Sequence, residues 1–426
     1  MVFTSLGTAT MTPKLVYLDS SDFSNLSNPD QDLSSENRLV LARLRQHKEA
    51  GTAIFFMSAI HLAEAVHAAT IYKPAAVRRA LLMRELCGTN FLKFATDLPR
   101  LELRKVLKGE AFASLTTEEL TSQKGEWFGF ESSLDSLPDL RRDAMRKIDE
   151  VFSKLPRYER RKRKSELNLK KQSSHAKWRE LIETSTPATF SDFPFSLVAR
   201  KATISWFLQE LSDKNFREEI LKVMRDPYAM FGFLLDATSH RGTLYELVRK
   251  QGRDTARDLG KMVSDQFPAL TAIAVLGEKV DLTGLMNQAC SRPDFLRKFI
   301  SAYADVGYDH IGDDEVANVV AACPSLSTFI ETAKAHLLAL SLAHITRIRA
   351  GNFSVKEVGH SDFGDLMHSF YAPYFDVFRC DARFGAHLKS QTHLRERIAD
   401  RITDLLRMLP ALPDLSSKPV GRISAA

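Results

Sequence analysis

The sequence predicts an α/β protein in which a small parallel sheet is assembled from two separated parts of the chain. Two short apolar runs near the start, Leu15–Leu18 and Ala53–Met57, are typical of buried strands and alternate with helical patterns. A third run, Phe375–Cys380, is aromatic and β-branched and comes near the end of the 426 residues. Strands that alternate with helices favour a parallel sheet, so we expect these three runs to lie side by side.

A long central segment has a different character, and it predicts a large all-helical insertion. From about Asp97 to Gly351 helical periodicity dominates, and almost nothing is typical of a strand. Prolines separate the helical stretches, and no repeat of fixed length is present. The expected organisation is therefore a discontinuous α/β domain with its first half at 12–96, a helical insertion with a basic run at 97–350, the second half of the domain at 351–412, and a flexible tail at 413–426.

The first half follows a strand–helix–strand–helix order, and it places two carboxylates beside strands. Asp19 comes directly after the first strand. Ser58 follows the second strand as a helix N-cap, and Glu64 lies about two turns into the helix that this residue begins. Gly51 and Gly88 stand where helices should end. The helices expected in this half are Glu36–Ala50, Ala59–Ala69 and Pro74–Cys87.

The second half repeats this arrangement with two more carboxylates. Asp365 begins a short amphipathic helix, Asp365–Tyr371, which Pro373 interrupts because proline lacks an amide hydrogen and clashes with the preceding turn. Asp381 comes immediately after the third strand. A further helix is expected near Thr392–Met408.

These positions predict an acidic site at one edge of the sheet. The carboxyl ends of parallel strands meet at the same edge, which is where ligands bind in open α/β sheets. The converging residues would be Asp19, Glu64, Asp365 and Asp381. Several carboxylates in one pocket repel one another unless cations neutralise them, and oxygen ligands alone suit Mg²⁺ or Mn²⁺. Taken singly, Asp19 is also a good N-cap and Glu64 a surface helix residue.

Three motifs resemble the acidic motifs of PIN-domain nucleases, in the same order. They read LVYLDSSDFSNL, MSAIHLAEAVH and GDLMHSFYAPYFDVFRCDARF. The third is the most specific, because it matches the pattern D-x-x-H-x-x-Y-x-P-Y-x-D-x-F-x-x-D from Asp365 to Asp381. The resemblance covers the two terminal parts of the chain, whereas the middle has no counterpart. It implies a compact parallel α/β fold with a large insertion between the motifs.

The resemblance also implies a function, a metal-dependent endoribonuclease that hydrolyses phosphodiester bonds. Asp19, Glu64, Asp365 and Asp381 would be both catalytic residues and ligands of Mg²⁺ or Mn²⁺, although Glu64 could instead stand just behind the ligands. Asp376 would be a further metal ligand, a hydrogen-bond partner of a residue next to a ligand, or a residue that ends a loop. His368, one helical turn after Asp365, would contact a substrate phosphate, orient a carboxylate or pack in the core. By resemblance alone we expect RNA rather than DNA as substrate, a toxin or defence role, a homodimer and an inhibitory partner protein.

The run Arg157–Arg179 predicts contact with nucleic acid. It contains ten Lys and Arg residues against two glutamates, and Tyr158 and Trp178 are available to stack on bases. The alternative is a solvated charged loop without a ligand. The candidate substrate-binding residues in this run are Arg161, Arg163, Lys164, Lys170 and Lys171.

The composition sets broader bounds. The chain has 44% hydrophobic and 26% charged residues, which is typical of globular proteins, and its net charge of +6 favours an anionic partner. No apolar stretch approaches a membrane span, no secretory pattern begins the chain, and the four cysteines form no C-x-x-C pair. We therefore expect a cytoplasmic protein. Two other hypotheses stay open: a non-catalytic nucleic-acid-binding or scaffolding protein on an inactive PIN-like fold, and a mostly helical interaction module.

Overall fold

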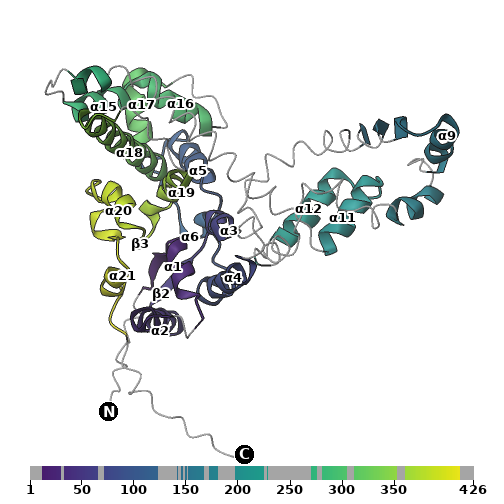
Figure 1. Cartoon of the computed structure of the whole chain (residues 1–426), viewed down its shortest axis with the longest axis horizontal. Coiled ribbons are helices and arrows are strands. Elements are labelled where there is room, and N and C mark those ends of the chain that lie inside the picture. The colour runs from purple at the N-terminus through teal and green to yellow at the C-terminus, as the bar shows by residue number, and fades with distance from the viewer. Residues whose placement is uncertain are drawn as a thin grey trace, which may run out of the picture.

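The structure is a computed structural model of the chain, and it has a mixed α/β fold with a four-stranded sheet (Figure 1). It describes residues 12–29, 33–65, 72–122, 142, 145–146, 149–150, 152–166, 172–180, 197–224, 228, 270–275, 281–304, 311–352 and 360–412.

All strand pairs of the sheet are parallel, and the strands follow the order β2-β1-β3-β4. Val16 pairs with Val377, so the first and last parts of the chain meet at the centre of the sheet. The strands are β1 (Lys14–Tyr17), β2 (Ala53–Phe56), β3 (Val377–Arg379) and β4 (Ile398–Ala399). The prediction of a parallel sheet from three separated runs is thus confirmed, and the reading of the chain as a mostly helical module without such a sheet is wrong.

Two expectations in the second half are wrong. The predicted helix Thr392–Met408 contains turns, a short 3-10 helix and strand β4 before helix α21 (Ile402–Met408) begins. A strand of two residues leaves no alternating pattern in the sequence, so this error has a plain cause. Helix α19 (His360–Ser369) begins before Asp365, which therefore lies inside the helix and does not open it.

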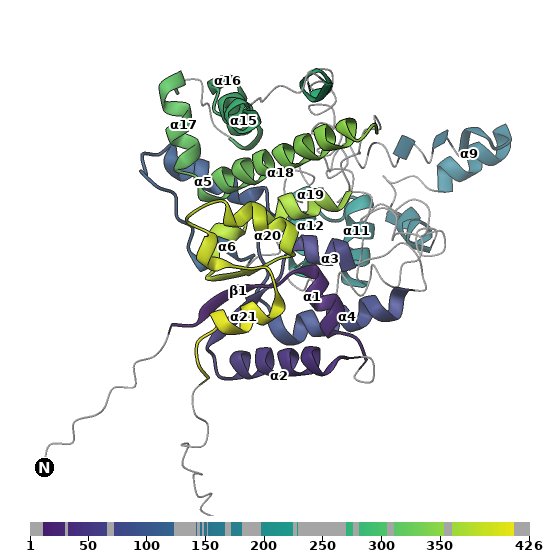
Figure 2. The same ribbon diagram turned by 60° about the vertical axis from the view of Figure 1, so that its left-hand side comes forward.

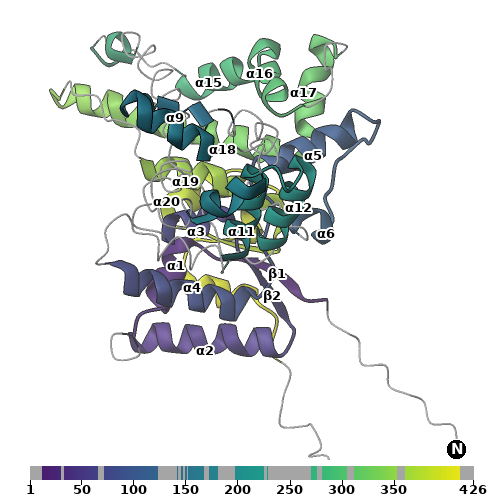
Figure 3. The same ribbon diagram turned by 90° about the vertical axis from the view of Figure 1, so that its right-hand side faces the viewer.

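Helices cover both faces of the sheet. On one side α2 (Ser35–Glu49) and α4 (Lys73–Cys87) pack against β2 (Figure 3), and α21 packs against β3 and β4. The side chain of Ser34 caps α2, and Gly51 after this helix has a φ of 65°, which glycine adopts at little cost. The core between the layers includes Val16, Tyr17 and Leu18, which are at most 1% exposed.

Four elements carry or support the candidate site. They are α1 (Ser20–Leu26), α3 (Ala59–Ala65), the 3-10 helix η3 (Ala372–Tyr374) and α20 (Ala382–Lys389). α1 begins directly after β1, and α20 begins directly after β3. Both helices therefore start at the carboxyl edge of the sheet.

From Asp97 to Gly351 the described residues form helices and contribute no named strand. Predicted helices at 228–237 and 243–263 lie outside the described residues, apart from residue 228. The helices in this part are α5 (Asp97–Val106), α6 (Thr117–Leu120), α9 (Arg157–Glu166), α11 (Leu197–Phe207), α12 (Asp213–Met224), α15 (Leu282–Cys290), α16 (Pro293–Tyr303), α17 (Asp313–Ala321) and α18 (Pro324–Arg349).

The 26-residue helix α18 joins this part to the sheet domain. It packs against α5, α19, α20 and η3, and α15, α16 and α17 lie over it (Figure 2). At its start, the backbone N–H of Ser325 donates to Glu102 of α5 at 2.9 Å, and the hydroxyl of Tyr374 donates to the same carboxylate. One buried carboxylate thereby connects three elements.

By length and composition, no single described helix would cross a membrane; only α17 and α18 taken together, at a bend of 99°, meet that criterion. The four cysteines are buried and free.

Candidate functional site

Asp19 and Asp381 occupy equivalent places on neighbouring strands. Asp19 is the N-cap of α1 and accepts hydrogen bonds from the backbone N–H of Ser21 at 3.3 Å and from its hydroxyl at 2.9 Å. Asp381 is the N-cap of α20 and accepts from the N–H of Phe384 at 2.7 Å. Because β1 and β3 are adjacent and parallel, both carboxylates lie at the same carboxyl edge. Asp19 and Asp381 therefore each cap a helix and also lie at the edge of the sheet where the candidate site is expected.

Glu64 and Asp365 join them from two helices that pack together, α3 and α19. One carboxylate oxygen of Glu64 lies against Gly364, where an added Cβ would be 2.5 Å from it. The other oxygen is 3.6 Å from Nε2 of His368. We call Asp19, Glu64, Asp365 and Asp381 the acidic centre.

The electrostatics of the acidic centre show that its members act on one another. The pKa of Asp365 is raised to about 7, chiefly by burial and also by the charges of Asp381, Glu64 and Asp19, against the lowering effect of His368. Burial would also raise the pKa of Glu64, but the adjacent His368 outweighs it and lowers this pKa to about 2. The pKa of His368 is raised, because the carboxylates around it overcome the effect of burial.

A buried polar network lies directly beneath the acidic centre. The hydroxyl of Tyr17 is 3.0 Å from Oγ of Ser58 and 2.5 Å from Nδ1 of His368. Nδ1 of His61 accepts from the N–H of Ser58 at 3.0 Å, and Nε2 of His61 lies 2.8 Å from the carbonyl oxygen of Leu18. His368 is only 6% exposed, which argues against its contact with a substrate phosphate; its 3.6 Å approach to Glu64 is compatible with orienting that carboxylate, and its burial with packing in the core.

Asp22 has a structural role beside the centre. Its carboxylate accepts from the backbone N–H of Asp19 at 3.1 Å and forms an ion pair with Arg379 at 3.1 Å. The side chains of Asp22 and Arg379 are 4% and 11% exposed, and burial raises the pKa of Asp22 to about 7 although Arg379 lowers it. This pair fixes the start of α1 to β3, and with it the backbone of Asp19.

The prediction that Asp376 shares the metal site is wrong. Asp376 precedes β3, so it lies at the amino edge of the sheet, opposite the acidic centre. There it accepts from the N–H of Leu15 at 2.9 Å and is 3.8 Å from Nζ of Lys14. A strand of three residues separates Asp376 from Asp381, which is enough to place them at opposite edges.

The acidic centre has the chemistry of a site for a hard divalent cation, because its donors are all carboxylate oxygens. Among the residues that the structure describes, no three His, Cys, Asp or Glu side chains stand close enough together to hold a metal ion. A bound Mg²⁺ or Mn²⁺ would therefore have to draw these carboxylates inward. The pKa of Asp365 is raised chiefly by burial, and the part of the rise that comes from the neighbouring carboxylates is repulsion that a cation would relieve.

The basic run lies apart from this centre. Figures 1 and 2 show α9 at the periphery, well away from the sheet. Arg161 is exposed and Tyr158 is 77% exposed, whereas Trp178 is 2% exposed and packs edge-on against Phe207. The prediction that Trp178 stacks on bases is therefore wrong. Arg163 and Lys164 belong to α9, and Lys170 and Lys171 lie outside the described residues.

Sequence reasoning missed three residues of this region. His61 is buried in the polar network, and Gly364 admits the carboxylate of Glu64. Asp400 follows β4 at the same carboxyl edge, where Lys389 pairs with it at 2.7 Å and lowers its pKa. The place of His61 could have been predicted from Ser58, which precedes it by three residues, because this is the spacing of a capping interaction at a helix start.

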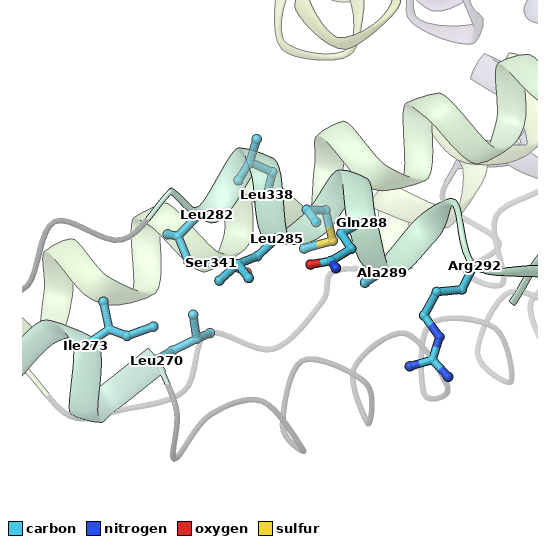
Figure 4. A pocket seen from close by; sticks show the side chains of 10 residues that line it. Leu270, Ile273, Leu282, Leu285, Gln288, Ala289, Arg292, Leu338 and Ser341 are labelled. Atoms are coloured by element: carbon cyan, nitrogen blue, oxygen red, sulfur yellow. The ribbon is translucent and has the colours of Figure 1, made fainter.

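A cavity of about 500 Å³ lies elsewhere, between α15 and α18 (Figure 4). Its wall is mainly aliphatic and includes no member of the acidic centre, so we do not connect it with the chemistry. The lining residues are Leu270, Ile273, Leu282, Leu285, Met286, Gln288, Ala289, Arg292, Leu338 and Ser341.

Comparison with known proteins returned no matching family model, no matching curated protein and no matching solved structure.

Proposed function

We propose that this protein is a metal-dependent nuclease with a PIN-like catalytic domain. The observation that carries the proposal is the meeting of Asp19, Glu64, Asp365 and Asp381, from both ends of the chain, at the carboxyl edge of one parallel sheet. Carboxylates gathered at the ligand-binding edge of an α/β sheet, with few neutralising cations around them, are typical of a divalent metal centre. The three motifs that resemble PIN-domain nucleases include all four residues.

The residues have distinct roles in this proposal. Asp19, Asp365 and Asp381 would hold Mg²⁺ or Mn²⁺, with Glu64 as a fourth ligand at the side nearest His368. The cation supplies a bound water of lowered pKa and stabilises charge on the phosphate oxygens. Because Asp19 and Asp381 cap the starts of two helices, they are held by backbone N–H groups and stay at the sheet edge. Their backbone positions are fixed in this way, while their side chains would have to turn inward to hold a cation.

The substrate class in this proposal is a nucleic acid, and RNA is the choice that the resemblance favours. The exposed cations of α9 support it, since neutralising phosphates releases counterions and gives affinity without sequence specificity. Tyr158 is exposed enough to stack on a base. The distance of α9 from the sheet means that it would hold a remote part of the strand rather than the scissile bond.

A second candidate function is a nucleic-acid-binding protein on an inactive PIN-like fold. One observation favours it: within the described residues, no group of carboxylates is already assembled closely enough to hold an ion. The two candidates differ in whether binding of a divalent cation completes the acidic centre.

The deciding experiment is cleavage of end-labelled single-stranded RNA and DNA in EDTA, Mg²⁺ or Mn²⁺. The variants are Asp19→Asn and Asp365→Asn, with Asp376→Asn as a matched control that removes the same charge at the opposite edge. We expect metal-dependent cutting by the wild type and the control, and its loss in the other two variants. Salt-sensitive binding without cutting by any of the four proteins would reject the nuclease and favour the second candidate.

A further inference from the structure

We infer that His368 is a positioning residue, and that together with Gly364 it forms a notch on α19 that holds the carboxylate of Glu64 in the orientation the acidic centre requires. This inference rests on the proposed function. It assigns a role to the histidine and the glycine of the third motif and to the buried network beneath them.

The notch is formed by two residues one helical turn apart. Oε1 of Glu64 lies over Gly364, at a point where a Cβ would be only 2.5 Å away, so any larger residue at 364 displaces this oxygen. Oε2 of Glu64 faces Nε2 of His368 at 3.6 Å. The two oxygens of one carboxylate are thus located by two neighbouring positions of the same helix, next to Asp365.

The orientation of the His368 ring follows from donors and acceptors around it. Nδ1 of this ring contacts the hydroxyl of Tyr17 at 2.5 Å. If the hydroxyl donates, the ring is the neutral tautomer that carries its proton on Nε2; if the hydroxyl accepts, both ring nitrogens carry protons. In either case Nε2 presents an N–H to Glu64, since a lone pair aimed at a carboxylate would be repulsive.

The buried polar network formed with Ser58 and His61 holds the side chain of Tyr17 in place. The backbone N–H of Ser58 can only donate, so Nδ1 of His61 accepts, and Nε2–H of His61 donates to the carbonyl of Leu18. Oγ of Ser58 then links His61 to the hydroxyl of Tyr17, whose ring is 1% exposed and stacks on Phe378. A chain of fixed groups therefore runs from β1 to Glu64. Partners of this kind, one step behind the ligands, set their orientation in metal sites.

Gly364→Ala is the sharpest test, because it separates positioning from folding. The atom it displaces is the end of a flexible side chain, and alanine favours a helix more than glycine does. We expect the melting temperature without metal to stay the same or rise, while the dissociation constant for Mn²⁺, measured by calorimetry on the full chain without nucleic acid, increases roughly 10–100-fold.

His368→Ala and His368→Gln provide the second test. Alanine removes the N–H that faces Glu64, whereas the glutamine amide restores a donor at the position of Nε2. We expect His368→Ala to weaken Mn²⁺ binding by roughly 10–100-fold and to lower kcat more than it raises KM, and His368→Gln to recover part of both losses. The control is His336→Gln, which changes a buried histidine of α18 outside the acidic centre and should leave Mn²⁺ binding unaltered.

The outcomes separate this inference from the proposed function. If the wild type binds Mn²⁺ and cleaves RNA, but Gly364→Ala and His368→Ala bind Mn²⁺ equally well, the notch is wrong and the nuclease stands. If the wild type neither binds Mn²⁺ nor cleaves, the proposed function fails and this inference fails with it. Recovery of Mn²⁺ affinity in His368→Gln to a level above His368→Ala supports the notch, and equal losses in both would overturn it.

Discussion

Carboxylates occur in two contrasting settings in this protein. Glu102 is fully buried, and it accepts from the N–H groups of Ser325 and Leu326 and from the hydroxyl of Tyr374. Asp22 is buried against Arg379. The acidic centre is the reverse case: its carboxylates are more exposed, they converge from four elements, and the one histidine beside them does not neutralise their combined charge.

The difference indicates which carboxylates stabilise the fold and which are retained for a ligand. A buried carboxylate with donors on every side connects elements, as Glu102 connects α5, α18 and η3. Carboxylates that raise one another's pKa cost stability in the absence of a ligand, and such groups in a cleft or at a sheet edge are typical of functional sites. Substitutions should therefore have opposite effects on stability in the two settings.

The largest expected effect is in the buried pair. Arg379→Met leaves the carboxylate of Asp22 without its cation while keeping most of the aliphatic volume, and we expect the free energy of unfolding to fall by about 3–5 kcal/mol. Urea unfolding measures the change. Arg407→Met breaks an exposed pair with Asp404 and should change stability by less than about 1 kcal/mol. Equal, small effects of the two substitutions would show that Asp22 does not depend on Arg379.

Glu102 should make the next largest contribution to the free energy of unfolding, and this contribution depends on pH. Burial raises its pKa from 4.5 to about 7 against the lowering effect of Tyr374 and the N–H groups. Between these values the folded state binds more protons than the unfolded state, so the stabilisation is fully present below pH 4.5 and is lost as the pH rises through about 7. The loss amounts to roughly 3 kcal/mol.

Glu102→Gln tests this dependence, because glutamine does not titrate. Unfolding in urea at pH 5 and pH 8 should show a stability difference in the wild type that is smaller by a few kcal/mol in the variant. At pH 5 the folded-state carboxyl is protonated and glutamine resembles it closely, so we expect the two proteins to differ in stability by less than about 1 kcal/mol. Parallel pH profiles for the two proteins would contradict the assignment.

Asp365→Asn should stabilise the protein in the absence of metal. Removing one charge from the acidic centre relieves repulsion by Asp381, Glu64 and Asp19, so without metal at pH 8 we expect stability to rise by about 1 kcal/mol. The same substitution should abolish the increase in melting temperature that Mn²⁺ causes in the wild type. Destabilisation by Asp365→Asn at pH 8 would place Asp365 with the structural carboxylates.

The sequence was sufficient where the signal was local. An apolar run followed by an acidic residue predicted both the strands β1 and β3 and the places of Asp19 and Asp381, because strand, cap and helix start are adjacent in the chain. The parallel arrangement followed from the alternation of strands and helices. Helix ends at Gly51 and Gly88 were predicted because glycine there adopts a positive φ.

The features of the fold and the candidate site that were not predicted depend mostly on contacts between residues distant in the sequence. The pair Arg379–Asp22 and the contact of Glu64 with Gly364 join the two ends of the chain, and neither leaves a pattern in either segment alone. β4 is too short to alternate. Asp376 was assigned to the wrong edge because the position of the short strand β3 decides on which side of the sheet a nearby residue lies.

Substitution of Arg161 in α9 should have the smallest effect on stability. It tests a positively charged residue, whereas the preceding comparison concerned carboxylates. Its side chain is exposed on a helix that lies away from the sheet, so Arg161→Ala should change the free energy of unfolding by less than about 0.5 kcal/mol. Its effect should be on binding. If the guanidinium neutralises one phosphate, the slope of log affinity for single-stranded RNA against log salt concentration should decrease by roughly 0.7. Arg38→Ala, which removes an exposed arginine from α2 on another part of the surface, is the matched control and should leave the slope unchanged. Equal slopes for all three proteins would mean that α9 is a solvated charged helix, and the cations that hold the nucleic acid would then have to be sought nearer the acidic centre.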